Sequence, residues 1–530
     1  MLGIKICLPA TAPLKLLSTM RLCLATLLAA SVCISAIDAL ANNGDLSVQI
    51  KGGVVYGTID SATPAVRQFL GIPYARPPVE NLRFAPPQPA LPFGELEAKK
   101  MPPSCMQYMS LLPNVYTREV PEFNLGGFNE TTGPISEDCL FLSVWAPRAK
   151  SKKKLPVIIF FYGGAFTVGG INAPYLVPSN WIQRTQNHIV VTFNHRDNIV
   201  GYPNAAGLPP DKQNVGLLDA RLAVEWVRDN IGAFGGDPER IGLWGQSSGG
   251  IIISYYSYVY REDPIANSII LASGNEFIDI LSHDPTHGNF TFVASHFGCG
   301  NLNPADELAC MRHADVDQIE EFLRARSDAG RTPPAFFSAV IDEHTVFADY
   351  ASLARAGRIA RLPALIGSNA QDGIPFIPYD PNGGDLALAD QITMTFFFCP
   401  TYQAARARIA AHDGDVPVYR YLYAGNFSNV SPKGWMGAYH GAEEPMVFET
   451  HSLVRGESTE LERQTAHAMQ DAWVSFVATA GRKMSVEGWD AKGEEGLVDG
   501  GRVVEFGNGV PARLVDTGEL EKQCREMGLS

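Results

Sequence analysis

A short glycine-flanked segment, Gly245-Gln246-Ser247-Ser248-Gly249, could hold a reactive serine at the end of a strand. The apolar run 240–245 before it predicts a buried strand, and residues 250–260 after it predict a helix. In this context the turn is tight, so the residues flanking the serine must be small. The dipole and free N–H groups at the helix N-terminus favour developing negative charge there. We therefore predict that Ser247 is a nucleophile; the alternative is a glycine-rich turn with an inert serine.

A second glycine-rich segment could supply the hydrogen-bond donors that a serine nucleophile needs. Tyr162-Gly163-Gly164-Ala165-Phe166 follows a continuous apolar run, 155–161, which predicts a strand buried on both faces. Small residues let the backbone approach a substrate carbonyl and turn its N–H groups inward. We predict that the N–H groups of Gly164, Ala165 and Ser248 form the oxyanion hole. The alternative is an ordinary turn at the end of a strand.

The elements that would position these segments alternate along the chain. Apolar runs predict further strands at 188–194, 268–274, 363–369 and 416–423, and helices at 217–231 and 460–481. This alternation predicts an α/β fold, with a mostly parallel sheet and helices on both of its faces. Residues 46–60 predict a small N-terminal antiparallel hairpin, and the proline-rich stretch 84–103 predicts irregular surface. Because no linker divides the chain, we predict one domain over 42–530.

Composition excludes several classes of function. The chain has 530 residues, of which 46% are apolar, so it can bury a large core. Its net charge of −14 and the lack of a basic run argue against nucleic acid as a partner. The sequence has no HExxH, dinucleotide-binding or phosphate-loop motif, so we predict neither a metal nor an organic cofactor. An acidic surface is compatible with a monomer or a homodimer.

The N-terminus holds the longest apolar stretch of the chain. Residues 22–37 are apolar, and an A-x-A cleavage pattern at 39–41 follows them. The stretch is shorter than the roughly 20 apolar residues of a membrane span. We therefore predict a signal peptide over 1–41, starting at Met1 or Met20, and a secreted mature chain with no permanent membrane anchor. The alternative is a membrane anchor.

Cysteines and glycosylation sequons are compatible with export. Six cysteines remain after the predicted signal peptide, and an even number in an exported chain predicts disulfides. The sequence alone leaves their pairing open, although Cys299 and Cys310 are near enough to close a small loop. The other four are Cys105, Cys139, Cys399 and Cys524. The candidate N-glycosylation sites are Asn129, Asn289, Asn426 and Asn429.

Landmarks of a known family appear in order along most of the chain. They are FLGIPYARPPVENLRFAPPQP at 69–89, SEDCLFLSVWAP at 136–147, the YGGAF loop, the segment 214–250, IGSNAQDG at 366–373 and GAYHGAEEPMVF at 437–448. Over residues 46–525 the chain thus resembles the type-B carboxylesterase/lipase family, which includes cholinesterases and fungal esterases and lipases. The resemblance implies one α/β-hydrolase domain and a catalytic triad of serine, acid and histidine.

Three residues match the family's triad. The nucleophile falls on Ser247, the base on His440, and the acid on Asp372, where most of the family has Glu. The order serine, acid, histidine is that of α/β-hydrolases. Asp372 follows a predicted strand and His440 lies in a glycine-bounded loop, and such loops collect catalytic groups at one sheet edge. The alternatives are a solvated aspartate and a structural histidine, with Glu443 and Glu444 as the nearest substitutes for the acid.

Departures from the family pattern narrow the substrate. Gln246 stands where many members have Glu, and the segment 105–139 lacks the Trp that holds a quaternary ammonium in cholinesterases. Both differences weaken the case for a cationic substrate. Ala165 replaces a third glycine and Tyr162 replaces a common His, but both leave the backbone donors in place.

The resemblance also implies contacts that stabilise the fold. The implied disulfides are Cys105–Cys139 and Cys299–Cys310, which leaves Cys399–Cys524, and the implied ion pair is Arg83–Glu137.

Together these features predict a secreted serine carboxylesterase that forms an acyl-enzyme from a small-molecule or lipid ester. One alternative is a lipase or sterol esterase for long-chain esters, with 109–115 and 125–128 in a lid. Another, from a different class, is a non-catalytic adhesion or ligand-binding protein on the same fold.

Overall fold

The computed structural model describes residues 46–123, 134–149, 151–489 and 502–529. The predicted signal peptide over 1–41 and the sequon at Asn129 lie outside these ranges. The chain divides into two units at Val48 and Gln49, and the large sheet belongs to the second, Gln49–Ser530.

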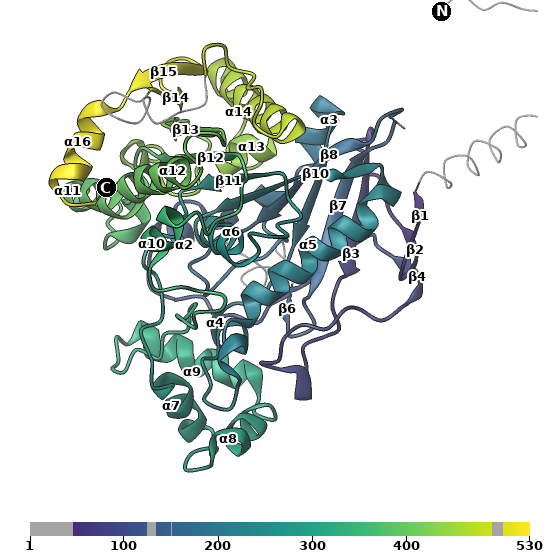
Figure 1. Cartoon of the computed structure of the whole chain (residues 1–530), viewed down its shortest axis with the longest axis vertical. Helices are drawn as coiled ribbons and strands as arrows, with labels where there is room; N and C mark the ends of the chain where they lie inside the picture. Colours follow the sequence, from purple (N-terminus) through teal and green to yellow (C-terminus); the bar gives the residue numbers. More distant parts are fainter. Residues whose placement is uncertain (1–45, 124–133, 150, 490–501, 530) are drawn as a thin grey trace, which may run out of the picture. The chain divides into compact units, whose positions relative to one another are not determined.

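A large sheet runs through the second unit (Figure 1). Among the described residues it has ten strands, in the order β15-β14-β13-β12-β11-β10-β8-β9-β7-β3. Their bounds are β3 Val66–Pro73, β7 Phe141–Pro147, β8 Leu155–Phe161, β9 Ile189–Phe193, β10 Gly236–Gln246, β11 Ser268–Ala272, β12 Ala364–Asn369, β13 Val418–Tyr423, β14 Arg502–Phe506 and β15 Ala512–Asp516. Neighbouring strands from β9 through β8, β10, β11, β12 and β13 to β14 are parallel, whereas β15, β7 and β3 pair antiparallel at the two sides. The predicted mostly parallel sheet is confirmed.

Helices cover both faces of this sheet, as the alternation along β10 demonstrates. The ring of Trp244 lies 6.4 Å from that of Trp473 in α14 (Glu460–Thr479). The next residue, Gly245, packs directly against the backbone of α6 (Ser248–Val259). Because successive residues of a strand point to opposite faces, α14 and α6 lie on opposite sides of β10. The helix α5 (Val215–Phe234) also packs on β10.

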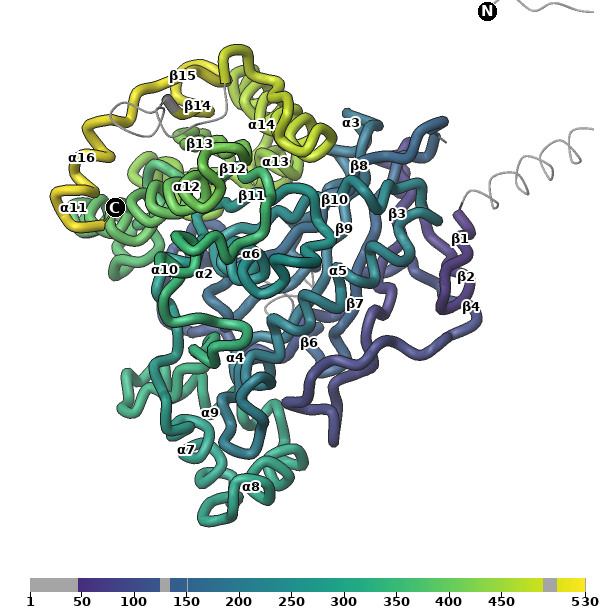
Figure 2. Tube along the Cα trace, in the orientation of Figure 1, coloured from purple at the N-terminus to yellow at the C-terminus, as the bar shows by residue number. Residues whose placement is uncertain are grey.

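The other helices lie between and around the strands. They are α2 Val115–Arg118, α3 Ser179–Thr185, α4 Asn198–Gly201, α7 Gly288–His296, α8 Pro304–Met311, α9 Val316–Asp328, α10 Tyr350–Arg355, α11 Leu386–Ile392, α12 Cys399–Ala411, α13 Glu444–Phe448 and α16 Gly518–Glu526. Cys524 in α16 forms a disulfide with Cys399 at the start of α12, and the two helices lie side by side (Figure 2).

The N-terminal region differs from its prediction. The expected hairpin is part of a three-stranded sheet, in the order β1 (Ser47–Ile50), β2 (Gly53–Tyr56) and β4 (Gly94–Glu97). The prediction of wholly irregular structure over 84–103 is wrong, because β4 forms there and pairs in parallel with β2. Gly94, with φ +73°, starts this strand two residues after Pro92. A second small sheet pairs β5 (Ser104–Cys105) with β6 (Ile135–Ser136).

Across residues 46–123, 134–149, 151–489 and 502–529, the structure has no helix with the length and apolar character needed to cross a membrane.

Candidate active site

Ser247 occupies a sharp turn between β10 and α6. Its backbone angles, φ 54° and ψ −127°, are unfavourable for a residue with a side chain. Gly245 and Gly249 flank it, and neither position has room for a Cβ, because their backbones touch each other and the end of β8. Ser247 is partly exposed, whereas Gln246 and Ser248 are buried. Among residues 245–249, Ser247 is therefore the one that is partly exposed, and it lies at the N-terminus of a helix.

The glycine-rich segment after β8 lies against this turn. A Cβ at Gly163 would approach to 2.8 Å from the Cβ of Ser247. Gly164 and Ala165 have positive φ angles of 124° and 57°, and both are partly exposed. Within the described part of the chain, no acceptor binds the backbone N–H of Gly164, Ala165 or Ser248. These three N–H groups are thus available to an oxygen near Ser247.

Asp372 and His440 form a buried pair. The Nδ1 atom of His440 lies 2.7 Å from Oδ1 of Asp372, and the Asp372 side chain has no exposed surface. The other carboxylate oxygen accepts hydrogen bonds from the Ser273 hydroxyl at 2.9 Å and from the Asn369 N–H at 2.7 Å. These bonds fix the short aspartate side chain at the end of β12, where it reaches the histidine without the extra methylene of a glutamate.

Two glycines next to this pair contact the turn that holds Ser247. Gly274, which follows Ser273, packs directly against the backbone of Ser247. A Cβ at Gly441, which follows His440, would lie 3.7 Å from Nε2 of Gln246. The Nε2 atom of His440 is buried and has no hydrogen-bond partner among the described residues. It is therefore free to accept a proton from a serine side chain, and such bonds often tighten only when substrate is present.

Glu443 and Glu444 lie beside the pair and form no described hydrogen bond to His440. Glu443 instead accepts a hydrogen bond from the side-chain amide of Asn369. Burial raises the pKa of Glu443 to about 7, and the charge of Asp372 adds to this effect. Burial also raises the pKa of Glu444 well above its ordinary value. Of the three acids, Asp372 alone contacts the histidine.

The raised pKa of Glu443 predicts a stability that falls as pH rises. Between its ordinary pKa of 4.5 and about 7, the unfolded chain loses this proton while the folded chain keeps it. The folded state is therefore favoured below about pH 4.5 and loses this advantage as the pH passes 7. Glu443→Gln should remove this loss. Between pH 5 and pH 8 the free energy of unfolding of the wild type should therefore fall, relative to that of the variant, by at most about 3 kcal/mol. Urea unfolding at both pH values would measure it, and an unchanged pH dependence would contradict it.

Aromatic side chains that carry no sequence motif surround His440. The rings of Phe376 and Phe397 lie 5.2 and 4.7 Å from the imidazole. The hydroxyl of Tyr116 donates a hydrogen bond of 2.7 Å to the backbone oxygen of His440. The ring of Phe123 packs against Tyr439 at 6.1 Å. These contacts could not be predicted from the sequence. Its only related feature is the aromatic content of the segment 105–139, which contains no Trp.

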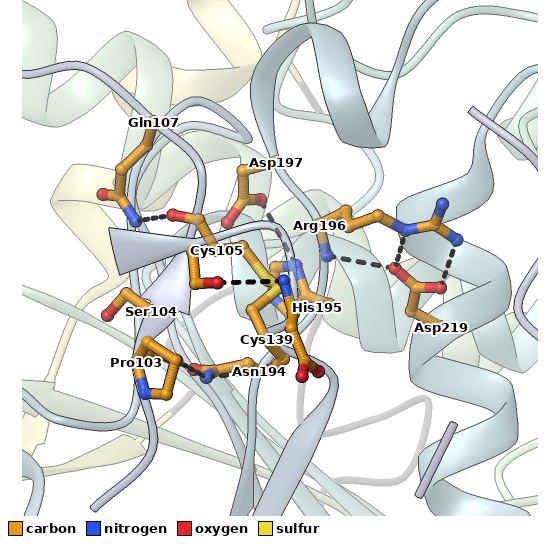
Figure 3. The surroundings of a disulfide bond; sticks show 12 residues. Pro103, Ser104, Cys105, Gln107, Cys139, Asn194, His195, Arg196, Asp197 and Asp219 are labelled. Carbon is orange, nitrogen blue, oxygen red and sulfur yellow. Dashed lines mark hydrogen bonds and ion pairs between the residues drawn. A yellow bond between two sulfur atoms is a disulfide. The ribbon is translucent and has the colours of Figure 1, made fainter. Parts of the chain in front are cut away.

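The three disulfides and the ion pair implied by the resemblance are present. The bonded pairs are Cys105–Cys139, Cys299–Cys310 and Cys399–Cys524, and Arg83 contacts Glu137 through two bonds of 2.6 and 2.7 Å. Figure 3 shows the first disulfide beside Asn194 and His195, which follow β9. The side-chain amide of Asn194 donates to the carbonyl of Cys139 at 3.1 Å. This disulfide therefore supports the segment behind the glycine-rich loop.

No group of three metal-ligating side chains occurs in the described ranges.

Comparisons with known proteins identify the family of this chain. Residues 44–389 and 384–495 match the model of the Carboxylesterase family. A chlorogenic acid esterase of Aspergillus niger is 42% identical over 466 residues, which cover 86% of this chain and 88% of that protein. Secreted lipase 5 of Gibberella zeae is 39% identical over 483 residues, which cover 84% of this chain and 88% of that protein. A mouse cholinesterase is 30% identical over 343 residues, or 64% of this chain and 55% of that protein.

Proposed function

We propose that this chain, which belongs to the carboxylesterase family and is a carboxylic ester hydrolase, acts through an acyl-enzyme on Ser247. The proposal is supported most by the Asp372–His440 pair, 2.7 Å apart, together with the contacts of Gly274 and Gly441 to the turn that holds Ser247. A structural serine would have no need of a strained backbone or of free donors.

Each group has a defined task in this reaction. The Ser247 hydroxyl oxygen attacks the ester carbonyl carbon while Nε2 of His440 takes the proton. The backbone N–H groups of Gly164, Ala165 and Ser248 stabilise the negative oxygen of the tetrahedral intermediate. The C–O bond then breaks, and the imidazolium returns its proton to the leaving alkoxide. Water that His440 deprotonates attacks the acyl-serine carbonyl carbon, the bond to the Ser247 oxygen breaks, and the imidazolium returns its proton to that oxygen as the carboxylic acid leaves. Asp372 orients the imidazole and stabilises the imidazolium.

The acyl-enzyme can be tested directly on the whole protein. A p-nitrophenyl ester should release one equivalent of p-nitrophenol per chain in a rapid burst if deacylation is slower than acylation. A fluorophosphonate should add to Ser247, as peptide mass analysis would detect. Hydrolysis without labelling of Ser247 would refute the serine mechanism. Labelling and turnover both absent in folded protein would favour the non-catalytic alternative.

An apolar surface beside His440 supports a lipase as the second candidate. Four large apolar side chains there are exposed by 37% to 49%: Phe376, Leu386, Leu388 and Phe396. They belong to three elements that contact one another, η5 (Ile374–Phe376), α11 and the π-helical turn η6 (Thr393–Phe398). Since Phe376 also packs on the imidazole, the surface is continuous with the proposed site. One relative is named a lipase, which agrees with this candidate.

The described part of the proposed lid supports a fixed loop instead. Leu111 and Leu112 are exposed by 68% and 52%. However, Asp328 accepts hydrogen bonds from the Ser110 hydroxyl at 2.6 Å and from the Leu111 N–H at 3.1 Å. Residues 125–128, the other half of the proposed lid, lie outside the described residues.

Substitution of the apolar surface separates lipase from esterase. Replacing Leu388 and Phe396 together by serine should lower the rate on an emulsified triacylglycerol roughly tenfold, because apolar contact area is lost. The rate on soluble p-nitrophenyl acetate should stay within about twofold. Leu91→Ser, at another exposed leucine, serves as the control. Equal losses on both substrates, or a wild-type rate that does not rise above the solubility limit of the ester, would argue against a lipase.

We further propose that the mature chain is extracellular. Three disulfides and a relative named as secreted support this location.

Two sequons that lie close together in the sequence should differ in their glycosylation. Asn426 is exposed, whereas Asn429 is 4% exposed and its amide donates a hydrogen bond of 3.0 Å to the hydroxyl of Ser458. A glycan on Asn429 would prevent this packing, so we expect the secreted folded protein to carry a glycan at Asn426 and none at Asn429. Peptide mapping after deglycosylation in heavy-oxygen water would read out each site. A modified Asn429 in active protein would contradict this prediction.

A further inference from the structure

The side chain of Tyr162 has contacts that the proposed mechanism does not use. Tyr162 follows the end of β8 and comes directly before the glycine-rich segment with the free N–H groups. Its side chain is 2% exposed. Burial raises the pKa of Tyr162 well above its ordinary value, as does the charge of Asp197, so the phenol stays protonated.

The hydroxyl of Tyr162 is bound to the segment after β9. It donates a hydrogen bond of 2.8 Å to the backbone oxygen of His195 and accepts one of 3.2 Å from the N–H of the same residue. A carboxylate oxygen of Asp197 lies 3.2 Å away. The phenol ring also stacks on the His195 imidazole, with centroids 4.3 Å apart and planes 11° apart.

The same segment is tied to the other side of the donor pair. The backbone N–H of Asn198 donates a hydrogen bond of 2.7 Å to the backbone oxygen of Phe166. Gly164 and Ala165 thus lie between two attachments to residues 195–198: the Tyr162 side chain before them and the Phe166 carbonyl after them. A change in either attachment would alter where their N–H groups point.

Residues 195–198 are themselves firmly held. The guanidinium of Arg196 donates bonds of 2.7 and 2.8 Å to the two oxygens of Asp219 in α5, and both residues are buried. The side-chain amide of Asn198 donates a bond of 2.7 Å to Glu320 in α9. The segment is therefore a fixed support rather than a loop that would follow a displaced Tyr162.

The far end of the glycine-rich loop also rests on Tyr162. The backbone of Gly169 touches the phenol ring so closely that a Cβ has no room. The side chain of Gln107 accepts a hydrogen bond of 2.9 Å from the N–H of Gly169 and donates one of 2.7 Å to its carbonyl. The ring thus has the clamped backbone of the loop on one side and His195 on another.

We propose that Tyr162 is a positioning residue, whose hydroxyl holds the N–H groups of Gly164 and Ala165 toward the oxyanion formed at Ser247. This inference rests on the proposed function. Oxyanion donors act only when they lie close to where the charged oxygen develops, so a small displacement weakens the transition state more than the bound substrate. A tyrosine hydroxyl that only stabilised the fold would not have this selectivity.

Tyr162→Phe tests the proposal, because it removes the hydroxyl and keeps the stacked ring. We expect kcat/KM on a soluble ester, counted per fluorophosphonate-titrated site, to fall roughly 10- to 100-fold. The inhibition constant of a trifluoromethyl ketone, which forms a tetrahedral adduct with the serine, should rise by the same factor. The inhibition constant of the alcohol product, which carries no oxyanion, should stay within about twofold.

Tyr419→Phe is the matched control, since Tyr419 is a buried tyrosine of β13 whose hydroxyl donates 2.8 Å to the carbonyl of Gly481. Its thermal midpoint should fall while kcat/KM stays near wild type. If Tyr162→Phe behaves like this control, the positioning role is wrong, although Ser247→Ala would still abolish turnover. If Tyr162→Phe does not fold, Gln107→Met releases the other end of the loop. This variant should lower kcat/KM and raise the inhibition constant of the ketone by a similar factor. If both constants stayed at their wild-type values, the proposal would be overturned.

Discussion

Replacing Ser247 by alanine is expected to lower kcat on a soluble p-nitrophenyl ester by roughly 10⁴- to 10⁶-fold. In the proposed mechanism this hydroxyl forms the covalent bond to the acyl group, and its neighbours Gln246 and Ser248 are buried. The backbone of the turn and its N–H groups remain, so KM should change little. The residual rate would come from the oxyanion hole and from binding. Initial rates at saturating ester, with the protein quantified by absorbance, measure the effect.

Ser257→Ala is the control for Ser247→Ala. Ser257 lies in the same helix, α6, and is 1% exposed; its hydroxyl donates to the carbonyl of Ser254 at 2.6 Å and accepts a bond of 3.4 Å from the guanidinium of Arg408. Its loss should cost about 1 kcal/mol of stability and no activity. If Ser247→Ala kept the wild-type rate, hydrolysis would have to proceed without an acyl-serine, and the positioning role of Tyr162 would lose its basis.

Local sequence pattern predicted the central strands closely because those strands are buried on both faces. The apolar run 155–161 coincides with β8, and 363–369 includes β12. Local pattern does not predict the order of the strands in the sheet, because that order depends on contacts between segments far apart in the sequence. The strands β4 and β15 had no strong pattern, since they lie at the edges of their sheets, where burial constrains the sequence less.

Residues of the candidate site could be predicted from the sequence only where the local structure or the family pattern requires one residue type. The turn around Ser247 requires small flanking residues, and Asp372 and His440 came from the family resemblance. The aromatic neighbours Phe376 and Phe397 could not be predicted, because any apolar residue satisfies the helical turns that carry them. The contacts of Tyr162 were equally hidden, since they depend on the path of the chain after β9.

Asp372→Asn is expected to lower kcat by roughly 10³- to 10⁴-fold, the second largest effect. The amide oxygen of the asparagine would still accept hydrogen bonds from Ser273 and the Asn369 N–H. Its NH₂ group would then face Nδ1 of His440, which could no longer carry a proton there. The proton would move to Nε2, the atom that must accept the proton of Ser247. The prediction is checked by kcat at several pH values with the thermal midpoint measured in parallel.

Two further variants decide which carboxylate performs this task. Glu443→Gln keeps an acceptor for the Asn369 amide, and because Glu443 does not contact His440, its kcat should stay within about tenfold of wild type. Asp372→Glu keeps the charge but adds a methylene to a side chain with no exposed surface, so it should lower kcat by overpacking rather than through the tautomer. A large loss in Glu443→Gln together with a small one in Asp372→Asn would transfer the role to Glu443. We expect the reverse pattern, a large loss in Asp372→Asn and a small one in Glu443→Gln, because Asp372 contacts Nδ1 of His440 at 2.7 Å.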